Sequence, residues 1–114
     1  MHIHEHQAKD LFKKNGIKVP DFIVVSNVNE TESACKKLGG SIWVVKAQVH
    51  AGGRGKGGGV IVCKNIQDAI DASGRLLGTN LVTPQTDANG QPINEVIIEA
   101  GQDIAKELYL GLLV

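Results

Sequence analysis

The sequence has few aromatic residues, few cysteines and no excess of charge of either sign. Phenylalanine, tryptophan and tyrosine make up only 4% of the 114 residues, so a core must be built mainly from aliphatic side chains. Twelve lysines and arginines balance twelve aspartates and glutamates. A balanced chain has no global field that would indicate binding to DNA, RNA or a membrane surface. The apolar runs are also far shorter than the roughly 20 residues that cross a bilayer.

Two cysteines, Cys35 and Cys63, are too few for a disulfide framework. We expect both to be free thiols, as in a reducing cytoplasm. The first six residues have no apolar segment, so we expect no secretion signal and a cytoplasmic location. Hydrophobic residues at 42% and charged residues at 21% are typical of a globular domain and argue against disorder.

Glycine is abundant, and its distribution is uneven. Six of the 14 glycines lie between positions 52 and 59. Each ordered glycine costs extra backbone entropy, so such a cluster indicates a local purpose. Charge is uneven as well, because no aspartate or glutamate occurs between Glu32 and Asp68, whereas carboxylates dominate from Asp68 to Glu107. This pattern indicates either solvated surfaces or an anion site in the middle of the chain, followed by a hydroxyl- or amine-binding site.

Predicted strands and helices alternate along the chain, which indicates an α/β or an α+β class. The spacing of Ala8, Leu11 and Phe12 predicts a helix over 4–14. Its apolar side should face the core, and Lys9 should lie among the charged residues on the other side.

A second helix is predicted to begin at a capping box formed by Asn29 and Glu32 and to end at Leu38. A third helix is predicted from Ile66 to Leu77. An Asn-Gly dipeptide predicts a turn within 87–92. Strands are predicted over residues 22–25, 42–49, 60–63, 81–83, 96–99 and 107–114.

The glycine-rich segment, residues 51–59, has three interpretations. A P-loop is excluded, because Lys56 is followed by glycine instead of serine or threonine and His50 occupies the position of the first glycine. A dinucleotide fingerprint is matched formally, but it must open a helix, and here an apolar β-branched segment follows. The third interpretation is a hairpin loop whose backbone N–H groups close over a triphosphate, with Arg54 and Lys56 adding charge. A hairpin loop without a ligand is the alternative.

Lys46 interrupts an otherwise apolar strand. Such a lysine often only faces solvent, but next to a glycine-rich hairpin loop it lies where the phosphates of a nucleotide would bind. Glu99 and Glu107 flank a polar linker, whose backbone could contact a purine while a carboxylate accepts hydrogen bonds from ribose hydroxyls.

His2, His4 and His6 alternate along the chain, a spacing that would place them on one face of a strand as zinc ligands. They lead into a predicted helix instead, where residues two apart do not face each other. We therefore expect no metal site there.

Four stretches resemble the start of the β subunits of succinyl-CoA synthetase, the ADP-forming succinate–CoA ligase. They cover residues 4–9, 43–56, 86–92 and 104–111. The motifs QVHAGGRGK and TDANGQP are the most specific, and the resemblance extends across the chain without large gaps. His6 stands where the family usually has tyrosine.

The resemblance implies the first part of an ATP-grasp domain, an incomplete α+β fold with a small mixed or antiparallel sheet, flanking helices and a glycine-rich hairpin loop. Residues 21–102 would form its small lid subdomain, residues 1–20 would begin the larger lobe, and residues 103–114 would be a truncated strand of that lobe. The family uses ATP and Mg²⁺ in the tricarboxylic acid cycle, converting succinate, CoA and ATP reversibly into succinyl-CoA, ADP and phosphate. Its phosphorylated histidine belongs to an α subunit, the expected partner.

The resemblance also implies roles for single residues. The metal ligands would lie beyond Val114, and no catalytic residue is expected within these 114 positions. Pro20 resembles the ATP-using members, although the choice between ATP and GTP stays open. Seven residues would bind nucleotide: Lys46 grips the phosphates, Gly53, Arg54 and Gly55 cover them, Glu99 and the backbone of Gln102 contact the base, and Glu107 contacts the ribose.

Two alternatives remain open. The chain could belong to a related acid–CoA ligase, such as malate–CoA ligase or the citrate-cleaving enzyme, or it could be a stand-alone nucleotide-binding module. Because the predicted last strand ends with the chain, we expect a fragment of a larger domain. Such a fragment should have no ligase activity by itself and should self-associate through its C-terminal strand.

Overall fold

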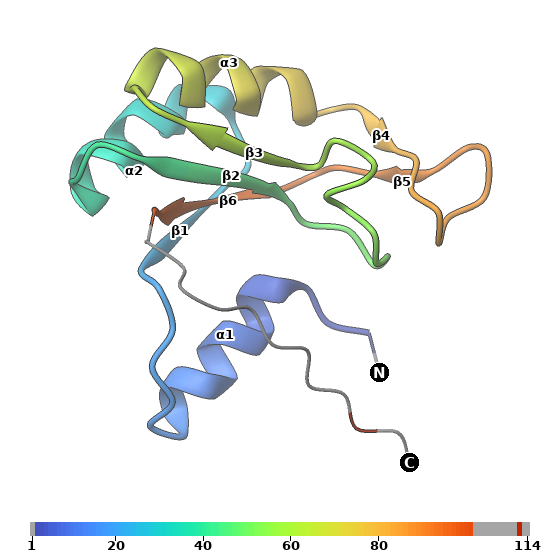
Figure 1. Cartoon of the computed structure of the whole chain (residues 1–114), viewed down its shortest axis with the longest axis horizontal. Coiled ribbons are helices and arrows are strands. Elements are labelled where there is room, and N and C mark those ends of the chain that lie inside the picture. The colour runs from blue at the N-terminus through green and yellow to red at the C-terminus, as the bar shows by residue number, and fades with distance from the viewer. Residues whose placement is uncertain (1, 102–111, 113–114) are drawn as a thin grey trace.

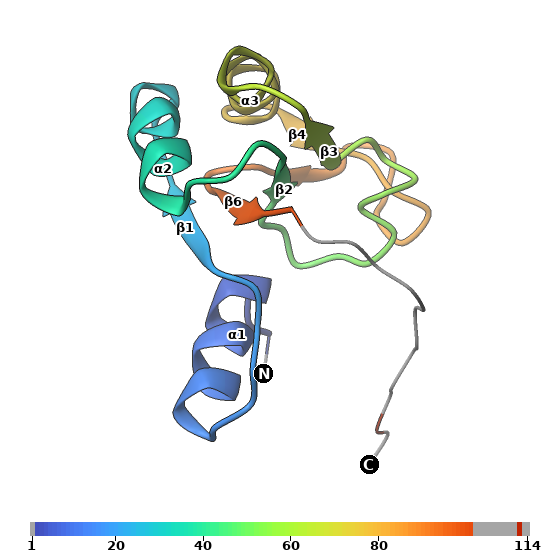
Figure 2. The ribbon, with the colours of Figure 1, turned by 60° about the vertical axis from the view of Figure 1, so that its left-hand side comes forward.

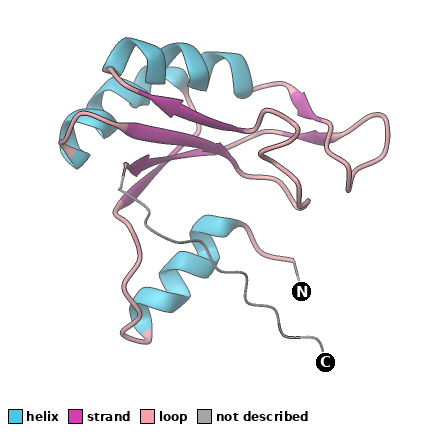
Figure 3. Cartoon of the chain, in the orientation of Figure 1, coloured by secondary structure: helices cyan, strands magenta, loops and turns pink. Residues whose placement is uncertain are grey.

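The protein consists of a sheet with helices on both sides, as a computed structural model of residues 2–101 and 112 shows (Figures 1 and 3). No helix in this part of the chain is long and apolar enough to span a membrane. In chain order the elements are α1 (Glu5–Lys14), β1 (Phe22–Val25), the 3₁₀ helix η1 (Val28–Glu30), α2 (Thr31–Leu38), β2 (Trp43–Ala47), β3 (Val60–Cys63), α3 (Ile66–Leu76), β4 (Asn80–Leu81), β5 (Gln91–Pro92) and β6 (Val96–Ala100).

The main sheet has the strand order β1-β6-β2-β3, and every neighbouring pair is antiparallel. β2 and β3 pair directly, with Trp43 opposite Cys63 and Lys46 opposite Val60. Residues 48–59, which include the glycine-rich segment, connect these two strands. The segment therefore leads into a strand and not into a helix, which excludes a dinucleotide fingerprint. The predicted α+β class is confirmed.

The core lies between one face of the sheet and the helices α2 and α3, which cover it from above in Figure 1. Along β2, Trp43, Val45 and Ala47 are buried while the residues between them are partly exposed, as expected for a strand with one covered face. Cys35 and Cys63 are free, as predicted, and both belong to this core. Burial raises the pKa of both thiols.

Helix α1 lies on the opposite side of the sheet from α2 and α3 (Figure 2). The prediction that its apolar side is buried is wrong. Leu11 and Phe12 are 51% and 47% exposed, whereas Lys9 is only 8% exposed. The reason is that the sheet face nearest to α1 carries charged side chains, so the helix turns toward it the residues that can pair with them.

The second helical segment begins two residues earlier than predicted. The pattern Asn-x-x-Glu occurs twice in overlapping register, and the structure uses the first copy. The side chain of Asn27 accepts a hydrogen bond from the Asn29 amide at 2.9 Å, and Glu30 accepts one from the Asn27 amide at 2.9 Å. This box opens η1, and α2 follows without a side-chain cap.

Two strand predictions differ in extent. The strand predicted over 42–49 is shorter in the structure and spans only β2, although the Gln48 amide just beyond it still donates to the Glu95 carbonyl at 3.0 Å. The segment predicted over 81–83 contributes only Leu81 to β4, which pairs with β5 across the predicted turn. Gly90 adopts a φ of 73° in that turn. The strand predicted over 107–114 lies outside the described residues, apart from Leu112.

The glycine-rich segment packs against residues 81–85. The Thr83 hydroxyl donates to the Gly52 carbonyl at 2.7 Å, and the two loops lie side by side at one end of the sheet (Figure 1). A Cβ atom at Gly57 would lie 2.5 Å from the Val82 carbonyl oxygen, and one at Gly59 would lie 2.7 Å from a Leu81 methyl carbon. At these positions glycine is needed because a side chain would collide with the neighbouring segment.

This contact predicts that Gly57→Ala lowers the free energy of unfolding by about 1–3 kcal/mol, the usual cost of overpacking. Gly55→Ala is the matched control, since a Cβ atom there would meet nothing within 4 Å. Urea denaturation of both variants measures the difference. Equal stability of the two would show that the contact with residue 82 does not restrict position 57.

Candidate functional site

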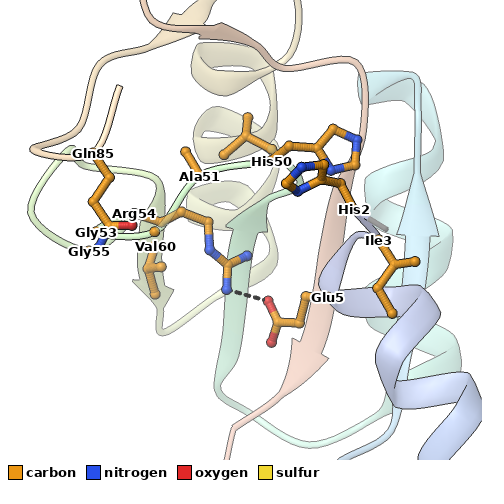
Figure 4. Close-up of a pocket in the computed structure, with 12 residues that line it drawn as sticks. His2, Ile3, Glu5, His50, Ala51, Gly53, Arg54, Gly55, Val60 and Gln85 are labelled. Carbon is orange, nitrogen blue, oxygen red and sulfur yellow. Dashed lines mark ion pairs between the residues drawn. The ribbon is translucent and has the colours of Figure 1, made fainter. Parts of the chain in front are cut away.

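A cavity of about 770 Å³ opens between the glycine-rich loop and the N-terminus of α1 (Figure 4). Its volume is in the range of small-molecule sites, which is roughly 300–1,000 Å³. The loop contributes Gly53, Arg54 and Gly55 to the lining, and the beginning of the chain contributes Glu5. The residues that line the cavity are His2, Ile3, Glu5, Val49, His50, Ala51, Gly52, Gly53, Arg54, Gly55, Val60 and Gln85.

The register of the sheet places Lys46 and Glu99 together beside this cavity. Lys46 on β2 lies opposite Ile97 on β6, so Glu99 is its diagonal neighbour on the same face. That face is turned away from α2 and α3. Lys46 Nζ lies 3.0 Å from Glu99 Oε2, and the two side chains are 20% and 11% exposed. Lys46 therefore does not simply face solvent, which was the alternative to a role in phosphate binding.

Arg54 reaches back from the glycine-rich loop toward the sheet and α1. Its Nη1 atom donates to the Ala47 carbonyl at 2.9 Å, which fixes the side chain against the end of β2. Its Nη2 atom lies 2.7 Å from Glu5 Oε2, the ion pair drawn in Figure 4. The loop, the sheet and α1 therefore meet at this guanidinium group.

Glu5 is the centre of the charge cluster, which consists of Glu5, Lys9, Lys46, Arg54 and Glu99. Its Oε1 atom lies 3.1 Å from Lys46 Nζ and 3.5 Å from Lys9 Nζ. Lys9 also pairs with Glu99. Burial by itself would raise the pKa of Glu5, but Arg54 and Lys46 outweigh it and lower this pKa from 4.5 to about 2. Glu5 is therefore ionised throughout the neutral range.

The charge cluster and the loop together have the chemical groups that an anion site needs. Three cations face two carboxylates, so one positive charge is left over at the cavity wall. In the part of the chain that the structure describes, the amides of Gly53, Arg54 and Gly55 donate to no carbonyl or side chain. Free backbone N–H groups next to arginine and lysine side chains are the elements of protein phosphate sites.

The structure brings together five of the seven residues predicted to bind nucleotide. Gly53, Arg54 and Gly55 line the cavity, and Lys46 and Glu99 lie beside it in the charge cluster. The other two predicted residues, Gln102 and Glu107, lie outside the described residues.

Glu5 and Lys9 were missed as members of the site. Both lie on a helix far from the glycine-rich segment in sequence, and Glu5 pairs with Lys46 across 41 positions. The only local signal was the spacing of Glu5 and Lys9 by four positions on one helix, which does not indicate which strand lies beside that helix.

Histidine rings form another part of the cavity wall. The rings of His4 and His50 stack with centroids 4.1 Å apart, and His2 lies edge-on to His50 at 6.2 Å. The rings of His4 and His6 also stack, with centroids 5.8 Å apart, and the Nε2 atom of His6 lies 3.3 Å from Glu95 Oε1. Burial and the neighbouring His50 lower the pKa of His4. Within residues 2–101 and 112, no three histidine, cysteine, aspartate or glutamate side chains are arranged to hold a metal ion.

Comparison with protein families gives one match across almost the whole chain. The model of the ATP-grasp domain matches residues 2–114. The chain belongs to the ATP-grasp domain family. The antiparallel sheet, the helices on one face and the glycine-rich connection described above are thus parts of an ATP-grasp domain.

Curated relatives of this ATP-grasp chain carry one shared name, succinate–CoA ligase [ADP-forming] subunit beta. The proteins from Alkalilimnicola ehrlichii and Pseudomonas aeruginosa are 55% and 54% identical to it over 114 residues. The protein from Ruthia magnifica is 54% identical over the same 114 residues. In each case all of this chain is aligned, but it spans only 29–30% of the relative's length.

The low pKa of Glu5 predicts a specific loss of stability in acid. A carboxyl whose pKa is lowered on folding stabilises the folded state above its unfolded pKa, here 4.5, and that contribution is lost as the pH falls toward 2. Between pH 6 and pH 3 the wild-type chain should therefore lose roughly 2 kcal/mol more than Glu5→Gln.

Urea denaturation at the two pH values measures this difference. Glu32→Gln is the matched control, because Glu32 pairs with Lys36 on the surface and its side chain is 57% exposed. It should follow the wild type. The low pKa of Glu5 would be disproved if Glu5→Gln had the same pH dependence as the wild type.

Proposed function

We propose that this chain is the nucleotide-binding part of the β subunit of an ADP-forming succinate–CoA ligase. One observation carries the proposal: Lys46 and Arg54 converge beside a cavity whose wall is a glycine-rich loop with free backbone amides. Membership of the ATP-grasp family supports nucleotide as the ligand. The shared name of the curated relatives supports the ligase.

The phosphates of ATP would bind at the cavity beside the charge cluster. Lys46 and Arg54 neutralise phosphate charge, and the amides of Gly53, Arg54 and Gly55 donate to phosphate oxygens. Catalysis of phosphoryl transfer consists mostly of such positioning and charge neutralisation. The chain's own contribution is therefore to hold the polyphosphate in place and to keep water from one side of it.

The base and ribose would bind toward the end of β6. Glu99 and the backbone of Gln102 contact the base, and Glu107 contacts the ribose hydroxyls. Glu99, which would contact the base, lies beside Lys46, which would contact the phosphates. This proximity supports the proposal that one nucleotide reaches both residues. ATP and GTP would be distinguished in this segment.

The same proposal divides the chain between two parts of the ATP-grasp domain. Residues 21–102 form the lid subdomain, residues 1–20 begin the larger lobe, and residues 103–114 continue it. The core between α2, α3 and the sheet supports this division, because α1 lies outside that core.

The remaining parts of the reaction would come from elsewhere in the protein. Mg²⁺ would be held by residues beyond Val114, and the phosphohistidine would be supplied by an α subunit. The reaction joins succinate and CoA at the expense of ATP, in the cytoplasm, as a step of the tricarboxylic acid cycle. By itself the 114-residue chain would have no ligase activity.

Replacing Lys46 with alanine in the intact protein tests the proposal. A hydrogen bond to a charged group contributes about 1.5–3 kcal/mol, so kcat/KM for ATP should fall roughly 10- to 150-fold. Lys36→Ala is the control, since Lys36 is a surface lysine whose side chain is 65% exposed. It should leave the kinetics unchanged.

Steady-state assays with succinate, malate and citrate in parallel determine the acid that is used. Activity with malate or citrate alone would replace succinate in the proposal. Unchanged kcat/KM in Lys46→Ala would remove Lys46 from the site.

We also expect the 114-residue chain to self-associate when it is produced alone. Leu11, Phe12, Ile17 and Leu112 are 51%, 47%, 53% and 92% exposed. Full burial of such a side chain is worth up to about 1.5–3 kcal/mol, so contact between copies is favourable. Light scattering of the chain, and of a variant with serine at positions 11, 12 and 112, measures this. A monodisperse wild-type monomer would contradict it.

A further inference from the structure

The carboxylate of Glu5 occupies the position of an anion between the two cations that face the cavity. One oxygen lies 3.1 Å from Lys46 Nζ, and the other lies 2.7 Å from Arg54 Nη2. Glu5 itself lines the cavity, and its side chain is 20% exposed (Figure 4). A carboxylate with one oxygen on each of two cations makes the same kind of charge-assisted contacts that a phosphate group would make.

A bound polyphosphate and this arrangement of Glu5 exclude each other electrostatically. With Glu5 in place, three cations face two carboxylates, and only one positive charge remains for the ligand. Placing several negative charges beside the ionised Glu5 would add like-charge repulsion at a site that is partly shielded from water. Moving Glu5 away from Lys46 and Arg54 reduces that repulsion and makes both cations available to the ligand.

We propose that Glu5 is an internal competitor of the phosphate ligand, which holds Lys46 and Arg54 in the ligand-free protein and releases them when phosphate binds. This inference rests on the proposed function, because it takes the cavity as the phosphate site. Nucleotide binding is then an exchange of anions at two fixed cations. The affinity for nucleotide then depends on Glu5, although Glu5 does not bind the nucleotide.

The structure leaves a partner for the released carboxylate. Lys9 lies one helical turn after Glu5, and its Nζ atom is 3.5 Å from Glu5 Oε1. Lys9 also pairs with Glu99, which keeps it in position when Lys46 turns to the ligand. Glu5 can therefore move from Arg54 toward Lys9 without becoming an unpaired charge in a partly buried position. The exchange requires a change of side-chain rotamer at the first residue of α1 and no change in the sheet.

The exchange also explains a feature of the sequence. The segment between Glu32 and Asp68 contains no carboxylate, so its own residues cannot neutralise Lys46 and Arg54. The neutralising groups come from α1 and β6. A carboxylate from a separate helix can be withdrawn, whereas one within the loop would move with Arg54.

The test compares the affinities of wild type, Glu5→Gln and the matched control Glu32→Gln for three probes. Isothermal titration of the intact protein is carried out with ADP, inorganic tripolyphosphate and adenosine. Glu5→Gln should bind ADP and tripolyphosphate about tenfold more tightly, the lower end of what a charge-assisted hydrogen bond contributes. Its affinity for adenosine should not change, because adenosine carries no phosphate. Glu32→Gln should match the wild type with all three probes.

The outcomes separate this inference from the proposed function. If wild type binds ADP and Lys46→Ala weakens that binding, but Glu5→Gln binds no more tightly, the site stands and the competition is overturned. Weaker binding of all three probes by Glu5→Gln would show a structural role and would also overturn it. If neither wild type nor Glu5→Gln binds ADP or tripolyphosphate, both proposals fail.

A second measurement on the wild type does not depend on the variant folding. In a ¹³C NMR titration, the Glu5 carboxyl should have a pKa of about 2 in the free protein. Saturating tripolyphosphate should move this pKa upward toward 4.5, because Lys46 and Arg54 are then engaged by the ligand. An unchanged Glu5 pKa in the presence of bound tripolyphosphate would show that Glu5 keeps its cations and would overturn the inference.

Discussion

Charges that leave water have to be paired, and this requirement organises the face of the sheet opposite the core. Lys46 points from the middle of β2 onto a face that is largely shielded from solvent. Glu99 supplies one partner through the strand register, and Glu5 supplies another from α1. Lys9 then compensates both carboxylates. The pairing determines which side of α1 faces the sheet, and it leaves the apolar side of that helix exposed.

The two faces of the sheet are stabilised by different forces. Between the sheet and the helices α2 and α3, aliphatic side chains and Trp43 are buried, which is the usual hydrophobic contribution. Between the sheet and α1, ion pairs bridge the elements. Ion pairs depend on protonation and on competing ions, whereas apolar contacts do not. The contacts that hold α1 on the sheet therefore depend on pH and ionic strength more than the contacts of the core do.

Sequence patterns predicted the elements of the core well, because each of these elements buries apolar residues at the spacing of its secondary structure. The continuous apolar, β-branched run over 60–63 and the helical spacing after Asn65 correspond to β3 and α3. The patterns failed for α1, because amphipathic spacing identifies two sides of a helix but not the side that meets the protein. Lys9 is buried because it pairs with Glu99, which is 90 positions away in the sequence. For the candidate site, the hairpin brought Lys46 and Arg54 together as expected, but the carboxylates that neutralise them could not be found by local reasoning.

The packing of the glycine-rich loop against residues 81–85 has a consequence for how strongly the protein can hold an anion. A loop of this composition loses much conformational entropy when it becomes ordered. Here that loss occurs during folding, through the Thr83 hydroxyl on the Gly52 carbonyl and the tight approach of Gly57 to Val82. A phosphate group bound at this loop, as proposed, would meet amides that are already in place. The free energy of the contacts between the phosphate and the loop amides would then contribute to affinity, because ordering the loop would offset little of it.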